Sequence, residues 1–496
     1  MTRWGMVIDL QKCIGCQTCT AICQQTHQVA SHTPWRRVVE CEMPGNPEEQ
    51  RLFLPMGCMH CTHPPCLEVC PTTATYRRPD GIVDIDYERC VGCGYCMMAC
   101  PYLARSLVSL NGTLPLAMGT GLPETSLLSQ DLQGVCTKCN FCLPRIEAGL
   151  AQGLQPGVSP EASPACVIFC TAHALHFGDL EDAESPVSRL INERTTVRLQ
   201  EALETDPAVH YLVGNLPLKG QELVPPMQQQ VWGWPAVLNF VWGGMGTGVY
   251  LLGLLMTVLG MGQPAGLKLL APVLVSLGFL AVTMEAGRPL RAPHLLRHLG
   301  RSWMSREALA GLLFLPLAFL DWLFPSPVFQ VPAAIAAAGL MLSQGYILYR
   351  ARAVTAWNVP LMPLLFVTMS LTAGIGLMLM LTPLWGGGSR LVLWGVIGVV
   401  LNLVLWLSYL YRSADTPFQK AIGALRQPHH LFLTVGVGYL LPLLLFLAWG
   451  VSSSLNIGVT LQPLIVVIAG LAILVGGLWQ KQGIIRQAGY LRGVRV

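Results

Sequence analysis

Two patterns of hydrophobic and polar positions divide the chain near residue 231. After that point, long apolar runs recur and are separated by short segments that carry most of the charge. A hydrocarbon core about 30 Å thick needs about 20 apolar residues per helix. The pattern therefore predicts eight membrane-spanning helices, near residues 234–260, 266–286, 307–325, 331–350, 359–382, 391–411, 430–450 and 460–480.

Before residue 231 the chain has short mixed segments punctuated by cysteines, and all 18 cysteines lie at or before Cys170. The whole chain is 12% charged, whereas a soluble domain has about 25%. We expect a cysteine-rich region at 1–185, a linker at 186–230 and a membrane region at 231–496. The net charge of +4 is too small and scattered to indicate nucleic acid. No apolar core precedes the first cysteine, so no secretory signal is predicted.

Cysteines in the first region recur in four groups with similar spacing. They are Cys13, Cys16, Cys19 and Cys23; Cys58, Cys61, Cys66 and Cys70; Cys90, Cys93, Cys96 and Cys100; and a split group of Cys136, Cys139, Cys142, Cys166 and Cys170. Three cysteines two residues apart wrap a loop around one cubane iron–sulfur cluster, and a fourth reaches a different cluster. Sharing of ligands in this way predicts a compact α+β domain of the double, pseudo-twofold bacterial ferredoxin type.

Two simpler interpretations of these cysteines are disfavoured. Zinc sites use C-x2-C pairs rather than runs of four, and disulfide frameworks belong to small secreted proteins. Four cubanes need about sixteen thiolates, so two cysteines are spare. Cys41 stands alone and is expected to be a buried structural residue. The second spare is one of Cys136, Cys139 and Cys142, which compete for two places.

The stretches CMHCTHPPCLEVCPTTATYRRPDGIVDID and ERCVGCGYCMMACPY resemble the four-cluster ferredoxin subunits of molybdopterin oxidoreductases. The resemblance covers about residues 3–185. The family motif K-C-x-x-C-x-x-R falls on Lys138, Cys139, Cys142 and Arg145, which leaves Cys136 outside. Thr171 replaces the proline that usually closes the fourth group.

The resemblance implies how the sixteen ligands are shared among four 4Fe-4S clusters. The first and fourth groups share two clusters, and the second and third groups share the other two. The implied quartets are Cys13, Cys16, Cys19 and Cys170; Cys23, Cys139, Cys142 and Cys166; Cys58, Cys61, Cys66 and Cys100; and Cys70, Cys90, Cys93 and Cys96.

The second half resembles the polysulfide reductase membrane-anchor family of quinone-binding subunits. The matching stretches are WGWPAVLNFVWGGMGTGVYL, EAGRPLR, SWMSRE and AWNVPLMPLLF. A histidine of that family falls on Asn239, and one of its tyrosines falls on an alanine near 337. Because ionisable groups in a membrane are costly, they are functional candidates. Residues expected at a quinone and proton site are Glu285, Arg288, Asn239 and Trp234.

Other features of the membrane half support structural interpretations. Glu285 could instead form an ion pair with Arg288 or Arg306, and Glu307 could serve as a helix-dipole partner. Gly244 and Gly248 lie inside an apolar run and predict close approach of another helix. The four histidines of this half lie in basic loops or at helix ends, so no haem is expected.

Basic residues are distributed unequally between the loops. Fourteen lie on the side shared with the cysteine region and two on the opposite side, which predicts that the cysteine region faces the cytoplasm across the inner membrane. The alternative is that these arginines dock the cysteine region or a partner.

The chain is expected to be a non-catalytic electron-transfer subunit that links a molybdopterin-containing partner to the quinone pool. One alternative is an ion-translocating complex, for which Asp321, Ser343 and Gln344 form a sparse polar trail. Others are a hydrogenase or multihaem cytochrome partner, or a pure scaffold.

Overall fold

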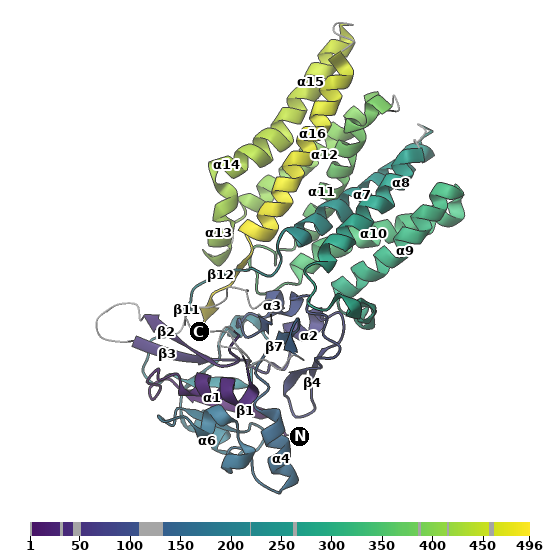
Figure 1. Ribbon diagram of the computed structural model, residues 1–496. Coiled ribbons are helices and arrows are strands. Elements are labelled where there is room, and N and C mark those ends of the chain that lie inside the picture. The colour runs from purple at the N-terminus through teal and green to yellow at the C-terminus, as the bar shows by residue number, and fades with distance from the viewer. Residues whose placement is uncertain are drawn as a thin grey trace. The chain divides into compact units, whose positions relative to one another are not determined.

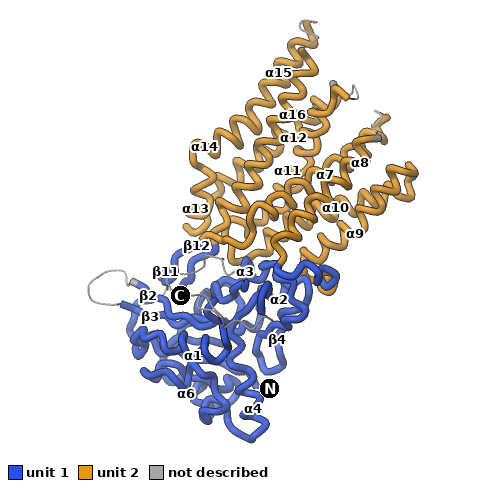
Figure 2. The backbone as a smooth tube through the Cα atoms, viewed as in Figure 1, with its two compact units in different colours: residues 1–227, 287–294, 491–496 blue, residues 228–286, 295–490 orange. Residues whose placement is uncertain are grey.

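The computed structural model describes residues 2–29, 33–42, 51–108, 132–218, 220–260, 265–384, 388–413, 416–455 and 461–496 (Figure 1). The chain forms two compact units, shown in different colours in Figure 2. Unit 1 contains residues 1–227, 287–294 and 491–496, and unit 2 contains residues 228–286 and 295–490. Segment 287–294 joins two long apolar helices in sequence, yet it belongs to the cysteine-rich unit.

Unit 1 contains a four-stranded sheet in the order β8-β1-β10-β9. The central strand β1 (Trp4–Asp9) is buried along its whole length. It pairs antiparallel with β8 (Leu175–Asp179) and parallel with β10 (Val209–Leu212), which pairs in turn with β9 (Thr196–Val197). The segment expected as a linker thus supplies two strands of this sheet and the helix α6 (Pro186–Glu193).

Short helices end the cysteine groups and pack in two pairs. Helix α1 (Thr18–His27) packs against α5 (Ala165–Ile168), and α2 (Pro65–Val69) packs against α3 (Tyr95–Ala99). The first and fourth groups are therefore partners, as are the second and third. Helix α4 (Leu143–Ala151) lies between the two parts of the split group.

Small two-stranded sheets also lie outside the bundle. They are β2 (Arg37–Glu42) with β3 (Arg51–Met56), β4 (Thr75–Arg77) with β5 (Val83–Ile85), β6 (Ser106–Leu107) with β7 (Cys136–Thr137), β11 (Glu222–Val224) with β14 (Val494–Arg495), and β12 (Met227–Gln228) with β13 (Tyr490–Leu491).

Within the described ranges, unit 2 contains eight spans long and apolar enough to cross a membrane, as the hydrophobic pattern predicts. They are α7 (Trp234–Val258), α8 (Ala265–Thr283), α9 (Trp303–Leu323), α10 (Pro327–Tyr349), α11 (Met362–Met380), α12 (Gly388–Leu410), the span Pro428–Ser454, made of α14 (Pro428–Leu431), η7 (Phe432–Leu440) and α15 (Leu441–Ser454), and the span Gln462–Gln487, made of α16 (Gln462–Gln482) and η9 (Gly483–Gln487). Between α12 and α14 lies the short helix α13 (Thr416–Ile422).

Helix α11 lies at the centre of the bundle and packs against α7, α10, α12 and α16. Its close approach to α7 confirms the prediction for the glycines of α7. A Cβ atom added at Gly248 would lie 2.3 Å from the carbonyl oxygen of Ser370 and 3.4 Å from Cα of Gly374. Small residues on both helices let the two backbones meet, which is how membrane helices pack without a hydrophobic driving force.

Candidate metal centres and membrane site

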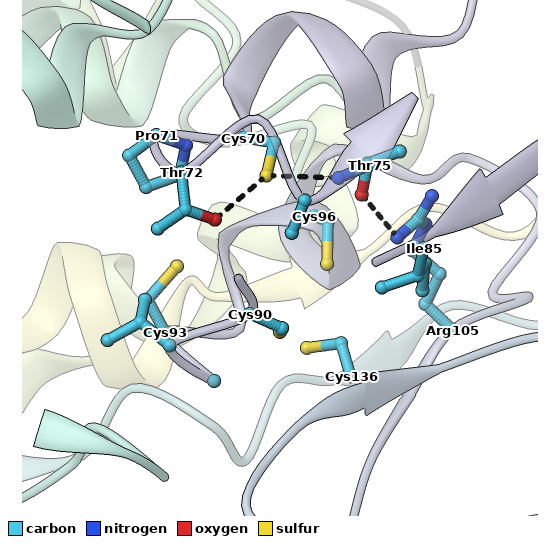
Figure 3. Close-up of a pocket in the computed structure, with 13 residues that line it drawn as sticks. Cys70, Pro71, Thr72, Thr75, Ile85, Cys90, Cys93, Cys96, Arg105 and Cys136 are labelled. Atoms are coloured by element: carbon cyan, nitrogen blue, oxygen red, sulfur yellow. Dashed lines mark hydrogen bonds between the residues drawn. The ribbon is translucent and has the colours of Figure 1, made fainter. Parts of the chain in front are cut away.

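Three hollows in unit 1 each contain one of the predicted cysteine quartets, whose members come from two different groups, and one hollow also has Cys136 in its lining. Their empty volumes are about 330, 320 and 320 Å³. Cage A contains Cys13, Cys16, Cys19 and Cys170; cage C contains Cys58, Cys61, Cys66 and Cys100; and cage D, shown in Figure 3, contains Cys70, Cys90, Cys93 and Cys96. In each cage one loop supplies three thiols and another group supplies the fourth.

A fourth quartet, cage B, consists of the remaining predicted ligands. The thiol of Cys23 in the middle of α1 interacts with those of Cys139, Cys142 and Cys166. The His27 Nε2 lies 3.1 Å from the Cys142 sulfur, and its ring lies 4.6 Å from that of Trp35. Burial lowers the pKa of His27 to about 4, so this imidazole is neutral at physiological pH.

The four loops share one backbone feature that the sequence spacing alone does not reveal. The residue immediately before the second ligand of each loop has a left-handed conformation, with φ of 72° at Gly15, 44° at His60, 69° at Gly92 and 57° at Phe141. This conformation is unfavourable for bulky side chains. The two bulky residues stack on each other with ring centroids 3.7 Å apart, and this contact helps to hold both loops in place.

The cysteine quartets are better suited to binding iron–sulfur clusters than to remaining as free thiols. Burial raises the pKa of Cys66 and of Cys142 to about 12, although Arg105 and Arg145 respectively act to lower it, so these thiols need further positive charge nearby to become thiolates. Cluster iron supplies that charge, because a metal-bound thiol is deprotonated. Among the described residues, no three His, Cys, Asp or Glu side chains are close enough to hold one bare ion. A cubane is compatible with that spacing because the cluster itself separates its four ligands.

Two buried arginines lie between neighbouring cages. The Arg36 Nη2 lies 3.9 Å from the Cys166 sulfur of cage B, and the guanidinium also interacts with Cys19 of cage A. The Arg105 Nη2 donates to the Cys66 sulfur of cage C at 3.0 Å and also hydrogen-bonds Cys96 of cage D. Each arginine therefore places one positive charge between two sets of thiolates. Sequence reasoning did not identify either residue, since isolated arginines carry no motif.

The cages form a row in the order A, B, C, D. Cys166 of cage B interacts with Cys19 of cage A, and Cys139 of cage B interacts with Cys58 of cage C. Cys66 of cage C interacts with Cys96 of cage D. The fold thus brings the four sequence groups into a continuous line of thiol sites.

In unit 2, Glu285 caps the first turn of α7. Its Oε1 accepts a hydrogen bond from the Gly233 N–H at 2.5 Å, and the Ala236 N–H also donates to it. Its Oε2 is buried and has no hydrogen-bond partner in the part of the chain that the structure describes. Burial raises the pKa of Glu285 to about 7, against the effect of these hydrogen bonds and of Arg486.

The cation that acts on Glu285 is Arg486, which is not one of the two ion-pair alternatives, Arg288 and Arg306. The Arg486 guanidinium lies 5.2 Å from the ring centre of Trp234, whereas Arg306 donates to the carbonyls of Leu299 and Gly300. Trp234 is 43% exposed. Glu285, Trp234 and Arg486 thus form an ionisable and aromatic cluster at the start of α7.

The other two predicted site residues lie elsewhere. Asn239 is buried in α7, and its Nδ2 donates to Glu307 Oε1 at 3.2 Å. Gln344 Nε2 lies 3.4 Å from the same oxygen. Glu307 is therefore held by two amides inside the bundle, in addition to its place near the N-terminus of α9 that suggested a helix-dipole partner. Arg288 belongs to unit 1, where its Nε donates to the Gln133 carbonyl at 2.8 Å.

Lys481 and Asp321 are also buried in the bundle. Lys481 in α16 is 2% exposed, and its Nζ donates to the Phe240 carbonyl at 2.6 Å. The expectation that Lys481 belongs to a basic tail was wrong, because α16 (Gln462–Gln482) continues past residue 480. Asp321 in α9 accepts from the Tyr250 hydroxyl at 3.1 Å and pairs with Lys268 at 3.4 Å.

Comparison with known proteins gives matches in both halves of the chain. The family described as "4Fe-4S dicluster domain" matches residues 50–113, and "DMSO reductase anchor subunit (DmsC)" matches residues 227–406. Candidate membrane helices and an anchor match together make this a multi-pass membrane protein.

Curated relatives include iron–sulfur subunits and B subunits of several reductases and a dehydrogenase. An iron–sulfur subunit of Halobacterium salinarum, named for dimethyl sulfoxide reductase, is 40% identical over 231 residues, covering 44% of this chain and 81% of that protein. A selenate reductase subunit of Mesobacillus selenatarsenatis is 37% identical, covering 42% of this chain and 72% of that protein. A sulfite dehydrogenase subunit of Allochromatium vinosum is 35% identical, covering 43% and 83%.

These relatives each cover less than half of the chain, and the anchor match accounts for much of the remainder. The cysteine groups and the membrane helices therefore correspond to two known families in one polypeptide. The chain belongs to the iron–sulfur subunits of the dimethyl sulfoxide reductase type, joined here to a membrane anchor of the DmsC type.

Proposed function

We propose that this chain carries electrons between a molybdopterin-containing catalytic partner and a membrane quinone through four 4Fe-4S clusters. In this proposal residues 1–185 hold the clusters in a double, pseudo-twofold ferredoxin arrangement, and residues 231–496 anchor the protein and bind quinone. Residues 186–230 connect the two and also supply β9 and β10 to the sheet of unit 1. The observation that carries it is the row of four cysteine quartets, A to D, within one unit. Each cubane would supply one-electron transfer when bound.

Sixteen cysteines serve as ligands in this proposal, and Cys136 is left out. The repeated left-handed residue supports this register, because Phe141 precedes Cys142 as Gly15 precedes Cys16. Cys136 lines cage D rather than contributing to cage B. The paired packing of α1 with α5 and of α2 with α3 supports the twofold arrangement.

Cage D is the end of the row that we assign to quinone. The loop that carries three of its cysteines is bound by segment 287–294 of the same unit. The N–H of Arg288 donates to the Val91 carbonyl at 3.0 Å, and Arg291 donates to the Cys90 carbonyl at 3.0 Å. In the chain, only Ala286 separates this segment from Glu285.

At the membrane end, Glu285 is our candidate for proton exchange with quinone. Its buried, unpartnered oxygen and its pKa of about 7 let it hold or release a proton at physiological pH. Trp234 and Arg486 beside it provide an aromatic face and a positive charge for a quinone ring and its oxygens. We keep Asn239 and Arg288 as supporting residues, the first through Glu307 and the second through segment 287–294. No haem takes part.

We further propose that the cluster domain faces the cytoplasm at the inner membrane. When Lys481 is left out, thirteen basic residues lie in the loops expected on the side of the cluster domain, and two lie in the loops expected on the opposite side. Such an excess is the expected bias for cytoplasmic loops. Arg288 and Arg291 also donate hydrogen bonds to the cage D loop, as described above. They are therefore weaker evidence for this orientation than the other basic residues.

The partner is inferred from the relatives, whose names include subunits of dimethyl sulfoxide reductase, selenate reductase and tetrathionate reductase. Mass spectrometry of the intact complex isolated from membranes tests this inference. A molybdopterin protein that copurifies in a fixed ratio is the expected result. A hydrogenase or a multihaem cytochrome in its place would contradict it.

Reduction of cluster variants by quinol tests which end of the row of cages exchanges electrons with quinone. Anaerobic, oxidised protein is mixed with a short-chain quinol, and cluster reduction is followed by EPR, with iron content measured in parallel. Loss of the cage A cluster in Cys13→Ser should leave the other three reducible. Loss of the cage D cluster in Cys93→Ser should slow reduction of the other three strongly. Equal effects of the two variants, or the reverse order, would contradict our assignment of cage D.

A second function, proton movement through the bundle, is favoured by two buried polar layers along α7. One layer contains Asn239 with Glu307, and the other contains Tyr250 with Asp321 and Lys268. At 1.5 Å per residue, Asn239 and Tyr250 lie about 16 Å apart along the helix, about half of the hydrocarbon core.

Proteoliposomes with a trapped pH dye test this second function. Asp321→Asn should abolish quinone-linked pH change while electron transfer continues. An unchanged pH response would exclude the route.

A further inference from the structure

The thiol of Cys136 lies in cage D as a fifth cysteine. Its side chain lines the same hollow as Cys70, Cys90, Cys93 and Cys96, and it is 2% exposed. In Figure 3 its sulfur points toward Cys90 and Cys96. Cages A and C, which have hollows of nearly the same volume, have four cysteines each and no fifth thiol in their linings.

The backbone holds Cys136 in this place. Strand β7 pairs with β6, with Cys136 opposite Leu107. On the preceding side, the Val108 N–H donates to the Val135 carbonyl at 3.0 Å, and the Gly134 N–H donates to the Val108 carbonyl at 2.8 Å. The thiol is therefore presented by a paired strand and not by a free loop end.

Contacts of the side chain define what it can do there. Cys136 hydrogen-bonds to both the Cys90 and the Cys96 side chains. A thiol is a weak donor, whereas a ligand sulfur on a cluster is negatively charged and accepts. Arg105 also hydrogen-bonds to Cys96, so the Cys96 sulfur has one charged side-chain donor and one neutral thiol beside it.

We propose that Cys136 is not a ligand in the loaded protein and instead donates an S–H hydrogen bond to the ligand sulfur of Cys90 or Cys96. Adding one electron makes the cluster and its thiolates more negative by one charge, and a donor to sulfur stabilises that reduced state. Hydrogen bonds to the sulfurs are among the factors that set cluster potentials. Cys136 thereby raises the reduction potential of the cage D cluster alone. This inference rests on the proposed cluster at cage D, the end assigned to quinone.

Redox titration followed by EPR tests the inference on the full chain. The cage D signal is identified as the one lost or altered in Cys93→Ser. In Cys136→Ala the iron content should stay at about sixteen per chain, and the midpoint of that signal alone should shift to more negative potential. In Cys136→Ser, which keeps a donor, the shift should be smaller. Cys41→Ala, which removes the other spare cysteine in β2, should move no signal.

The possible failures can be told apart. A loss of about four irons in Cys136→Ala would make Cys136 a ligand and overturn the donor role. A full set of irons with an unmoved cage D midpoint would also overturn it, while leaving the four-cluster proposal intact. Wild-type protein without iron–sulfur signals would overturn the proposed function and this inference with it.

Discussion

Replacing Glu285 with glutamine separates its two roles, because glutamine keeps an oxygen that can cap α7 but cannot carry a proton. With a pKa of about 7, the ionised fraction of Glu285 rises from about a tenth at pH 6 to about nine-tenths at pH 8. An ordinary exposed glutamate would be almost fully ionised over that whole range. The change is therefore close to ninefold only because burial has raised the pKa.

Turnover between the clusters and quinone should follow this ionised fraction. In wild-type protein, quinol oxidation needs the carboxylate to accept a proton, so its rate should rise about ninefold from pH 6 to pH 8, with a midpoint near 7. Quinone reduction needs the protonated acid, so its rate should fall over the same range. Stopped-flow measurement of cluster reduction and oxidation at fixed quinone concentration gives both profiles.

Glu285→Gln should flatten both profiles and slow turnover while the EPR signals of the clusters stay unchanged. Glu285→Ala should in addition lose the cap on α7, which costs about 1 kcal/mol, and should lower the unfolding temperature where Glu285→Gln does not. The same pH profile in Glu285→Gln as in wild type would refute the reasoning and remove this carboxyl group from proton exchange.

Two further predictions follow from contacts in the two units. In EPR-monitored titrations, Arg105→Gln should shift the midpoint potentials of the cage C and cage D clusters to more negative values. Arg36→Gln should do the same for the clusters of cages A and B. Shifts in all four clusters in either variant would contradict the placement of these charges. Gly248→Val should destabilise the bundle by about 1–3 kcal/mol through overpacking, because its Cβ would meet the Ser370 carbonyl at 2.3 Å. Thermal unfolding in detergent measures this loss of stability. Gly477→Ala is the control, since a Cβ at that position meets nothing within 4 Å. Equal stability of the two variants would argue against the close helix contact.

The sequence predicted the parts of the structure that depend on local pattern. Eight spans follow from apolar runs long enough for a bilayer, and cysteine spacing gave four thiol groups. Pairing of these groups into quartets could be inferred only through family resemblance, because it depends on contacts between distant segments such as α1 and α5. The close contact at Gly248 was predictable because small residues four apart are a local signal.

Residues that act through burial or long-range contact were not predictable. Arg36 and Arg105 look like ordinary surface arginines until the fold places them between cages. Glu307 stands at the start of a helix, where a carboxylate normally faces water, yet packing places it against Asn239. Lys481 follows an apolar run and resembles a flanking charge, but the helix continues and buries it.

Iron and acid-labile sulfide analysis of the anaerobically purified chain tests the central claim most directly. The account predicts about sixteen iron and about sixteen sulfide per polypeptide, with a visible absorption band that bleaches on reduction and with EPR signals from four interacting clusters. Colourless protein, or protein that binds a metal other than iron at these cysteines, would contradict it.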